Sequence, residues 1–283
     1  MSDLNALLHS RSFVELGARQ RAAALLDQGS LRDLLDPFAR VKSPWLEAQG
    51  IVAQADDGVV VAKGSIGGRP VVIAAIEGNF QGGSLGEVGG AKLAGALELA
   101  AEDNRNGIPT AAVLLLETGG VRLQEANLGL AAIAEVQAAI VEVRQYQPVI
   151  GVVAGPVGCF GGMSIAAGLC SHLLVTREAR LGLNGPQVIE QEAGLDEYDS
   201  RDRPFIWSLT GGEQRAACGL VDAYLADEVS VIRECLLQTL EQPGEALPRS
   251  RQYARFLDLL ARFDAAPQAD AASVRALYQG DQA

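Results

Sequence analysis

Short apolar runs alternate with long segments of helical periodicity through the middle of the chain. Three of these runs lead into glycine turns: Ala111–Glu117 before Gly119-Gly120, Val149–Ala154 before the turn that starts at Gly155, and Leu181–Leu183 before Gly185. The repeated order of strand, glycine turn and helix predicts an α/β protein with a parallel sheet, in which ligands bind at the carboxyl ends of the strands. We therefore expect function to lie at these turns.

The N-terminal segment follows a helical pattern instead. Ser12 and Glu15 have the spacing of a capping box, which predicts a helix that continues to about Leu26. A second, short helix is expected over Ser30–Leu35. We expect residues 1–48 to form a helical arm, which either packs on the main domain or binds another subunit.

The remainder, residues 49–283, is expected to form one domain with a helical C-terminal tail. Its first part predicts an antiparallel lead-in to the sheet, because strand-like runs at 50–54, 58–64 and 70–76 are separated by turn residues. Residues 192–203 interrupt the periodicity and predict a loop. Further helices are expected at 205–209, 213–218, 230–240 and 249–263, a last short strand after 219–222, and a frayed tail from 265 onward.

Composition narrows the class of partner. The net charge of −12 argues against nucleic acid or an anionic membrane, because both require a basic face. The four cysteines contain no C-x-x-C pair, so neither a zinc ribbon nor a disulfide framework is predicted, and we expect no bound metal. With no basic and apolar leader and no membrane-length apolar run, we expect a cytoplasmic protein.

A glycine-rich loop, residues 79–90, precedes the first long helix. It contains neither the phosphate-cradling G-x-x-x-x-G-K-[ST] pattern nor the dinucleotide fingerprint G-x-G-x-x-G, so nucleotide binding by those two modes is not predicted. The glycines are explained by tight turns and close helix packing. Lys92, one turn into the helix, is the candidate for a contact to a phosphate.

Several strings together carry a resemblance to a known family. They are Gly86-Glu-Val-Gly89 with Lys92, the G-G-x-R-x-Q-E-A string from Gly119 to Ala126, Gly155-Pro156 with Gly161-Gly162, Asn184-Gly-Pro-Gln-Val-Ile-Glu-Gln191, and Gly219-Leu-Val-Asp222. From about Gly50 to Asp227 the chain resembles the β subunits of acyl-CoA carboxyltransferases, which belong to the crotonase superfamily. The resemblance implies a ClpP/crotonase-like fold of repeated ββα units.

Within that family the chain is most similar to the biotin-independent malonate decarboxylase β subunits. The four-cysteine zinc ribbon of the acetyl-CoA carboxylase subunits is absent. The central turn, Gly155 to Gly162, is two residues longer than the usual form, and residues 192–207 replace the usual helix. The segment Ser12–Leu16 also matches the Ser-Phe-x-Glu-Leu start of those decarboxylases. The activity implied is decarboxylation of a malonyl thioester on an acyl carrier protein, giving the acetyl thioester and CO2.

The chemistry of such a reaction indicates which groups to look for. Loss of CO2 from a malonyl thioester leaves an enolate, whose charge collects on the thioester oxygen and calls for preorganised donors. Backbone N–H groups at glycine turns, one of them opening a helix, suit this role because no Cβ blocks approach. We predict Gly120 and Gly161 as the donors of this oxyanion hole, with Gly119 and Gly162 shaping the turns. The predicted substrate-binding residues are Gly86, Lys92, Arg122, Gln187 and Glu190.

The resemblance also implies the cofactors and partners. No cofactor is expected on this chain, because the substrate is carried by the phosphopantetheine-type prosthetic group of an acyl carrier protein. The expected partners are a homologous γ subunit that completes the site, the acyl carrier protein subunit and an acyl carrier protein transferase subunit. The proton for the enolate comes from the γ subunit or from water.

Other candidate residues have structural alternatives. His172 is either a residue at a helix end or a catalytic one, and Cys159 is either a buried filler or a nucleophile. Arg122 and Glu125 form either a solvent-facing pair or one that fixes the turn. Gln187, Glu190 and Gln191 either complement the start of a helix or line an interface.

Three other functions remain open from the sequence. A biotin-dependent carboxyltransferase subunit shares the motifs but normally carries the zinc ribbon. A Clp-type serine peptidase would use Ser164 as nucleophile, but Asn184 stands where the base histidine is required. A scaffold subunit whose partner holds all the chemistry is the third.

Overall fold

The computed structural model describes residues 10–52, 58–125, 127–242, 248–263 and 270–279. In these ranges seven strands form one sheet in chain order. The strands are β1 (Arg32–Leu35), β2 (Val59–Ile66), β3 (Arg69–Ile76), β4 (Ala111–Leu115), β5 (Val149–Val153), β6 (His172–Thr176) and β7 (Ala223–Leu225). The first three are antiparallel, and β3 to β7 are parallel, as the lead-in and the β–α alternation predict.

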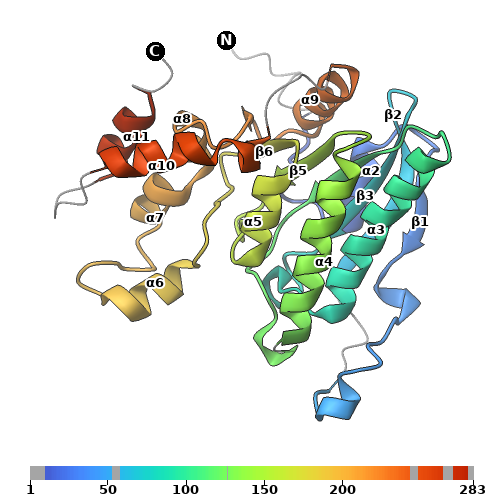
Figure 1. Cartoon of the computed structure of the whole chain (residues 1–283), viewed down its shortest axis with the longest axis horizontal. Coiled ribbons are helices and arrows are strands. Elements are labelled where there is room, and N and C mark those ends of the chain that lie inside the picture. The colour runs from blue at the N-terminus through green and yellow to red at the C-terminus, as the bar shows by residue number, and fades with distance from the viewer. Residues whose placement is uncertain (1–9, 53–57, 126, 243–247, 264–269, 280–283) are drawn as a thin grey trace.

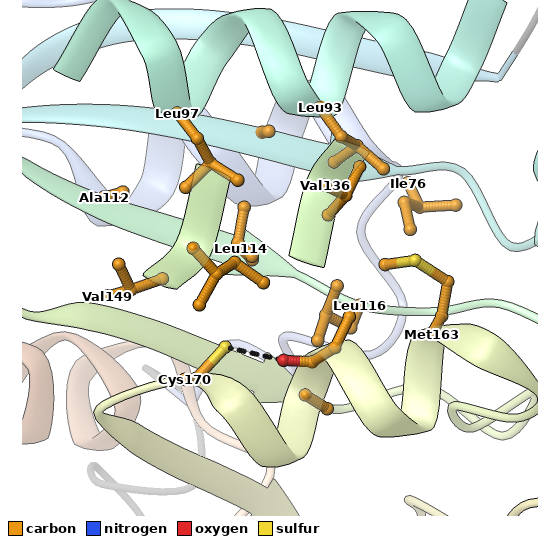
Figure 2. Close-up of a cluster of buried hydrophobic side chains, with 14 of the residues drawn as sticks. Ile76, Leu93, Leu97, Ala112, Leu114, Leu116, Val136, Val149, Met163 and Cys170 are labelled. Carbon is orange, nitrogen blue, oxygen red and sulfur yellow. Dashed lines mark hydrogen bonds between the residues drawn. The ribbon is translucent and has the colours of Figure 1, made fainter. Parts of the chain in front are cut away.

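The sheet has helices on both faces, because its strands are apolar on both sides (Figure 1). On strand β4, Ala112 and Leu114 belong to the core beneath α3 (Glu87–Arg105), α4 (Asn127–Val143) and α5 (Gly162–Leu169). Figure 2 shows part of this core, in which Leu93, Val136 and Met163 approach the sheet from the three helices. The opposite side chains of β4 pack beneath α2 (Ala18–Leu25) and α9 (Val229–Glu241).

Much of the C-terminal third, apart from β7 and α9, extends beyond the sheet. It contains α6 (Pro186–Ala193), α7 (Arg203–Thr210), α8 (Gly212–Ala217), α10 (Tyr253–Arg262) and α11 (Ala271–Gln279). Helix α6 projects from the body of the molecule (Figure 1), while α11 contacts α8 and α10. Short 3-10 turns occur at 37–39, 47–49, 81–83, 123–125 and 249–251. Within the described ranges, no helix combines the length and apolarity needed to cross a membrane.

Further backbone pairings occur beyond the carboxyl ends of the strands. Isolated parallel bridges join Leu85 to Val121, Thr118 to Cys159, and Cys159 to Leu181. Each stretch of chain therefore leaves the main sheet, pairs once more beside its neighbour and then enters the next helix or loop. These bridges bring the glycine turns together at one edge of the molecule.

The N-terminal arm differs from the sequence-based prediction. The expected helix at Ser30–Leu35 is wrong: its last four residues form β1, because Arg32 and Asp33 pair with Lys63 and Ala62 of β2. The capping box does not start a helix either. Ser12 Oγ does accept from the N–H of Glu15, but α2 begins only at Ala18. Tertiary pairing overrides local propensity at both places.

Three further predictions need correction. The strand expected at 50–54 does not form at Gly50–Val52, and 53–54 lie outside the described residues. The run Leu181–Leu183 forms an isolated bridge to Cys159 and is not one of the strands of the described sheet. The tail expected to fray contains α11, which begins at Ala271; residues 265–269 lie outside the described ranges.

Candidate active site

The first glycine turn follows β4 and is fixed on both sides. The N–H of Gly119 donates to Gly82 O at 2.9 Å, and the N–H of Leu85 donates to Gly120 O at 2.9 Å. Gly120 has φ +112°, a backbone conformation that residues other than glycine rarely adopt. The turn is therefore held against the glycine-rich loop that precedes α3.

The second glycine turn follows β5 and ends at the amino terminus of α5. Gly161 is the N-cap of this helix, with φ +62° and ψ −146°. The turn is joined to the first one by two backbone hydrogen bonds, from Thr118 N to Gly158 O at 2.7 Å and from Phe160 N to Thr118 O at 3.1 Å. The two turns therefore form one rigid unit.

Gly120 and Gly161 come into direct contact, so the structure brings together the two residues predicted from the sequence. A Cβ on Gly161 would lie 3.4 Å from Gly120 Cα and 3.9 Å from Val121 N. A Cβ on Gly120 would lie 3.4 Å from Phe160 O. At these distances an added Cβ would make only ordinary van der Waals contact, so the positive φ of both residues is what favours glycine here.

The N–H groups of these two glycines are already used. Gly120 N donates to Thr118 Oγ1 at 3.0 Å, and Gly161 N donates to Leu183 O at 2.7 Å. Within the described part of the chain, the N–H groups of the next residues, Val121 and Gly162, have no acceptor. The N–H groups of the predicted pair are thus engaged within the protein, and those of the two following residues are not.

A cavity of about 540 Å³ lies beside the first turn. Its volume suits a small ligand or the end of a carrier arm. The predicted residues Gly119 and Arg122 line it, together with Ile51, Val52, Gln81, Gly82, Ser84, Val121, Leu123, Gln124 and Glu125. Val52 and Leu123 are about 80% exposed, at 79% and 81%, so an apolar surface adjoins the cavity.

Arg122 and Glu125 form a buried pair that fixes the turn. Arg122 Nη1 lies 3.0 Å from Glu125 Oε1, and the two side chains are 3% and 4% exposed. Arg122 also donates to Ser84 O at 2.9 Å, and Glu125 Oε2 accepts from the N–H of Glu87, the first residue of α3. The solvent-facing alternative is therefore wrong, and this pair ties the turn to the start of α3.

Gly86 and Lys92 are packed against other parts of the protein. A Cβ on Gly86 would lie 2.2 Å from a carboxylate oxygen of Glu125, so glycine makes room for that carboxylate. Lys92 is buried, and its Nζ donates to the main-chain oxygens of Asp36 at 3.1 Å and Val59 at 3.4 Å. The phosphate contact expected for Lys92 does not fit this orientation.

The predicted residues of α6 lie apart from the cavity. Gln187 is exposed on this helix. Glu190 accepts a hydrogen bond from Ser200 N at 2.6 Å, and that bond lowers the pKa of Glu190. Glu190 thereby holds the 194–202 loop against α6, which is a structural contact that the sequence did not suggest.

Arg180 is a residue of the site region that the sequence did not indicate. Its guanidinium lies over the rings of Trp207 and Phe160, at 4.6 and 5.4 Å from their centroids. It donates to Pro156 O at 2.7 Å and Val157 O at 3.2 Å. Arg180 therefore holds the carbonyl side of the second turn, an arrangement that depends on segments far apart in the sequence.

Among the described residues, neither Cys159 nor Ser164 has the surroundings of a catalytic nucleophile. Cys159 is fully buried, and burial raises the pKa of its thiol well above the usual range. Ser164 Oγ donates to Gly161 O at 2.8 Å. His172, the one histidine in the described ranges, lies at the amino end of β6 in a different cavity. His9 lies outside the described residues. Among those residues no cluster of three potential metal ligands occurs either.

Residues 14–239 match the family described as "Carboxyl transferase domain". Since the match covers most of the 283 residues, the chain belongs to the carboxyl transferase domain family. The resemblance predicted from the glycine motifs is confirmed, and so is the crotonase-type fold.

Three individual relatives narrow the comparison further than the family does. A malonyl-S-ACP:biotin-protein carboxyltransferase, MADC, from Malonomonas rubra is 38% identical over 255 residues, which cover 87% of this chain and 80% of the relative. The chain is also similar to a subunit of a Pseudomonas malonate decarboxylase hetero-tetramer solved in complex with malonate. The identity is 73% and the TM-score 0.91, over 98% of this chain and all (100%) of that one. The Pseudomonas MdcD-MdcE hetero-dimer matches at 62% identity and a TM-score of 0.75, over 90% and 98% of the two chains.

Proposed function

We propose that this chain is the catalytic β subunit of a malonate decarboxylase, which converts a malonyl thioester into the acetyl thioester and CO2. The similarity to the Pseudomonas hetero-tetramer, at 73% identity over nearly the whole of both chains, supports this reaction. The geometry that carries it is the pair of glycine turns, which presents two N–H groups without acceptors in the described part of the chain.

The proposed step breaks the bond between the carboxylate carbon and the α-carbon. CO2 leaves, and the electron pair moves through the α-carbon onto the thioester oxygen as an enolate. We assign the N–H groups of Val121 and Gly162 to this oxygen. Gly162 opens α5, so its N–H also carries the positive end of the helix dipole. A proton from the partner or from water then reaches the α-carbon.

The predicted donors keep a role in this proposal. Gly120 and Gly161 supply the positive φ values of the two adjacent turns, and their own hydrogen bonds to Thr118 and Leu183 hold the neighbouring N–H groups in place. Removing one oxyanion donor costs roughly 3–4 kcal/mol of transition-state stabilisation in other enzymes. A preorganised pair is therefore worth enough to carry much of the catalysis.

We further propose that a homologous γ subunit covers the exposed side of the site. Ile165 on α5, Leu183 before α6 and Val188 on α6 are 52%, 60% and 46% exposed, and the carbonyl of Leu183 accepts from Gly161 N of the second turn. Apolar groups of this kind are typical of the core of an interface. The relatives crystallised as hetero-oligomers support such a partner.

The remaining subunits follow from the same proposal. An acyl carrier protein would bring the malonyl group on its phosphopantetheine-type arm, and a transferase subunit would load it. No cofactor would then be bound by this chain. We place the complex in the cytoplasm, because the four cysteines are unpaired.

The test is CO2 release from malonyl-acyl carrier protein. The complex with the γ subunit should release CO2 at the same rate with and without avidin, while this chain alone should show little activity. Metal analysis of the complex should return no stoichiometric zinc. Loss of turnover with avidin, one zinc per chain, or full activity of the isolated chain would contradict the proposal.

A second candidate is transfer of the carboxyl group to a biotin protein. It is favoured by the 38% identity to the Malonomonas enzyme, whose name describes that transfer. The enolate would form in the same way, but the carboxyl group would appear on biotin instead of as free CO2. Recovery of carboxybiotin, together with inhibition by avidin, would select this candidate.

A further inference from the structure

The carboxyl end of β4 holds an ion pair that the proposed mechanism does not use. Glu117 lies two residues after the end of β4 and precedes the first glycine turn. Its carboxylate accepts from Nη1 of Arg21, a residue of α2 in the N-terminal arm, and the two residues are 6% and 5% exposed. A carboxylate buried this deeply costs free energy unless it is paired.

The surrounding backbone leaves room for this carboxylate. A Cβ on Gly155 would lie 1.7 Å from Glu117 Oε1, and a Cβ on Gly78 would lie 2.6 Å from its Cδ. Neither glycine has a positive φ, so the space taken by Glu117 is what requires glycine at these positions. The N–H of Val157, in the second turn, points at Glu117 Oε1 from 3.5 Å. The carboxylate thus lies between the loops that follow β3, β4 and β5.

Arg21 is itself fixed by three acceptors. Besides Glu117, its Nε donates to Phe13 O at 3.0 Å and its Nη2 to Val14 O at 2.7 Å, while the ring of Phe13 lies 5.4 Å from the guanidinium carbon. The N–H groups of Phe13 and Val14 both donate to Asp227, just beyond β7, at 2.8 Å. The arm is therefore bound to residues that follow two strands, β4 and β7.

Glu77 extends the same arrangement to β3. It follows the last residue of that strand, and its Oε2 accepts from the N–H of Ala18, the first residue of α2, at 2.9 Å. The residues Glu77, Glu117 and Asp227 therefore connect the arm to the carboxyl ends of β3, β4 and β7. Of these three strands, β4 leads into the first glycine turn and is paired with β5, which leads into the second.

We propose that the N-terminal arm positions the active site through the Arg21–Glu117 pair, which sets the distance between the two glycine turns. This inference rests on the proposed decarboxylase function. Glu117 contacts no substrate here; it acts through Thr118, whose N–H and C=O are the two groups that join the first turn to the second. A displacement of about 1 Å in a catalytic geometry can cost about a hundredfold in rate.

The experiment compares two carboxylates at opposite ends of the same strand. Glu117→Gln removes the charge beside the glycine turns. The matched control is Asp103→Asn, since Asp103 is also buried, pairs with Lys63 and accepts from Thr110 at the amino end of β4. Both variants are assembled with the γ subunit, and both kcat and KM are measured with malonyl-acyl carrier protein.

Glu117→Gln should lower kcat roughly 10- to 100-fold with KM within about twofold, because the carrier surface is untouched while the donor pair shifts. Asp103→Asn should lose stability but keep kcat. Arg21→Lys retains one charged donor, so its kcat should lie between wild type and Glu117→Gln. It also replaces Glu117→Gln as the test variant if the latter does not assemble. Equal losses of kcat in Glu117→Gln and Asp103→Asn, or an unchanged kcat in Glu117→Gln, would overturn the inference.

Amide hydrogen exchange separates this inference from the proposed reaction. Peptides covering residues 118–122 and 156–162 should exchange faster in Glu117→Gln than in wild type, and Asp103→Asn should leave them unchanged. If the wild-type complex releases no CO2, the proposed function fails while the exchange data still decide the positioning role. Unchanged exchange in Glu117→Gln would refute the positioning role even in an active enzyme.

Discussion

The two ends of the sheet are built differently, although each has an ion pair whose acidic residue is buried. At the carboxyl end, Glu117 pairs with Arg21 where Gly78 and Gly155 leave room for the carboxylate, and the two glycine turns approach each other at Gly120 and Gly161. At the amino end, Asp103 pairs with Lys63, and side chains line a cavity of about 780 Å³ that includes His172. The backbone N–H groups that we assign to the enolate oxygen, those of Val121 and Gly162, lie at the carboxyl end. Substitutions at the carboxyl end should therefore affect catalysis, and those at the amino end should affect stability.

The largest expected loss of kcat follows substitution of Gly161. Gly161→Val would place a branched side chain 3.4 Å from Gly120 Cα at φ +62°, which valine does not adopt without strain. We expect kcat to fall by about a hundredfold or more, comparable to the loss of one oxyanion donor. The measurement is CO2 release by assembled complex.

Gly107→Ala is the matched control for that variant. Gly107 also has a positive φ, +82°, but lies after α3 near the amino end of β4, where an added Cβ meets nothing within 4 Å. It should cost about 1 kcal/mol of stability and leave kcat unchanged. If both variants lose activity equally, or if Gly161→Val turns over normally, the two ends of the sheet do not differ as described.

The next effect concerns the buried pair of the first turn. Glu125→Gln would leave Arg122 without its charged partner and weaken the cap on α3, so the complex should lose about 3 kcal/mol of stability. Val121 N would also shift, and we expect kcat to fall about tenfold. Chemical denaturation and steady-state kinetics measure the two quantities. A variant as stable as wild type would show that the pair does not fix the turn.

A smaller effect, on stability alone, is expected at the amino end. Hydrogen bonds from the N–H of Gly68, Ser65 and the N–H of Gly67, together with Arg233, lower the pKa of Asp27 to about 2. An unfolded Asp titrates near about 3.9, so this stabilisation is present above pH ~4 and is lost as the pH falls toward 2. Asp27→Asn should cost about 1 kcal/mol at pH 7 and less at pH 3. Urea denaturation at the two pH values tests this, and an equal cost at both would contradict it.

The smallest effects are expected at Cys159 and His172. Cys159 fills a buried position, and His172 lies at the opposite end of the sheet from the turns. Cys159→Ser and His172→Gln should each keep kcat within about threefold, with a modest loss of stability for the serine variant. An inactive Cys159→Ser in a folded complex would point to covalent catalysis and would replace the enolate mechanism at these turns.

The sequence by itself was sufficient for the parallel sheet, the approach of two glycine turns to each other and the family. Apolar runs that end in glycine predicted β4 and β5 and the turns after them, because these patterns depend on local backbone preferences. The contact between Gly120 and Gly161 also followed, since carboxyl ends of parallel strands share one edge.

Only the tertiary structure decided which groups of the site are available. Gly161 N is occupied by Leu183 O, 22 residues later in the chain, and Lys92 is directed to main-chain oxygens of Asp36 and Val59. Such acceptors come from distant segments, so no local pattern indicates them. The strand β1, found where a helix was predicted, has the same cause, because its pairing with β2 outweighs a weak local preference. Hydrogen bonds between distant segments determine which backbone donors remain free, and that is what the fold adds to the sequence.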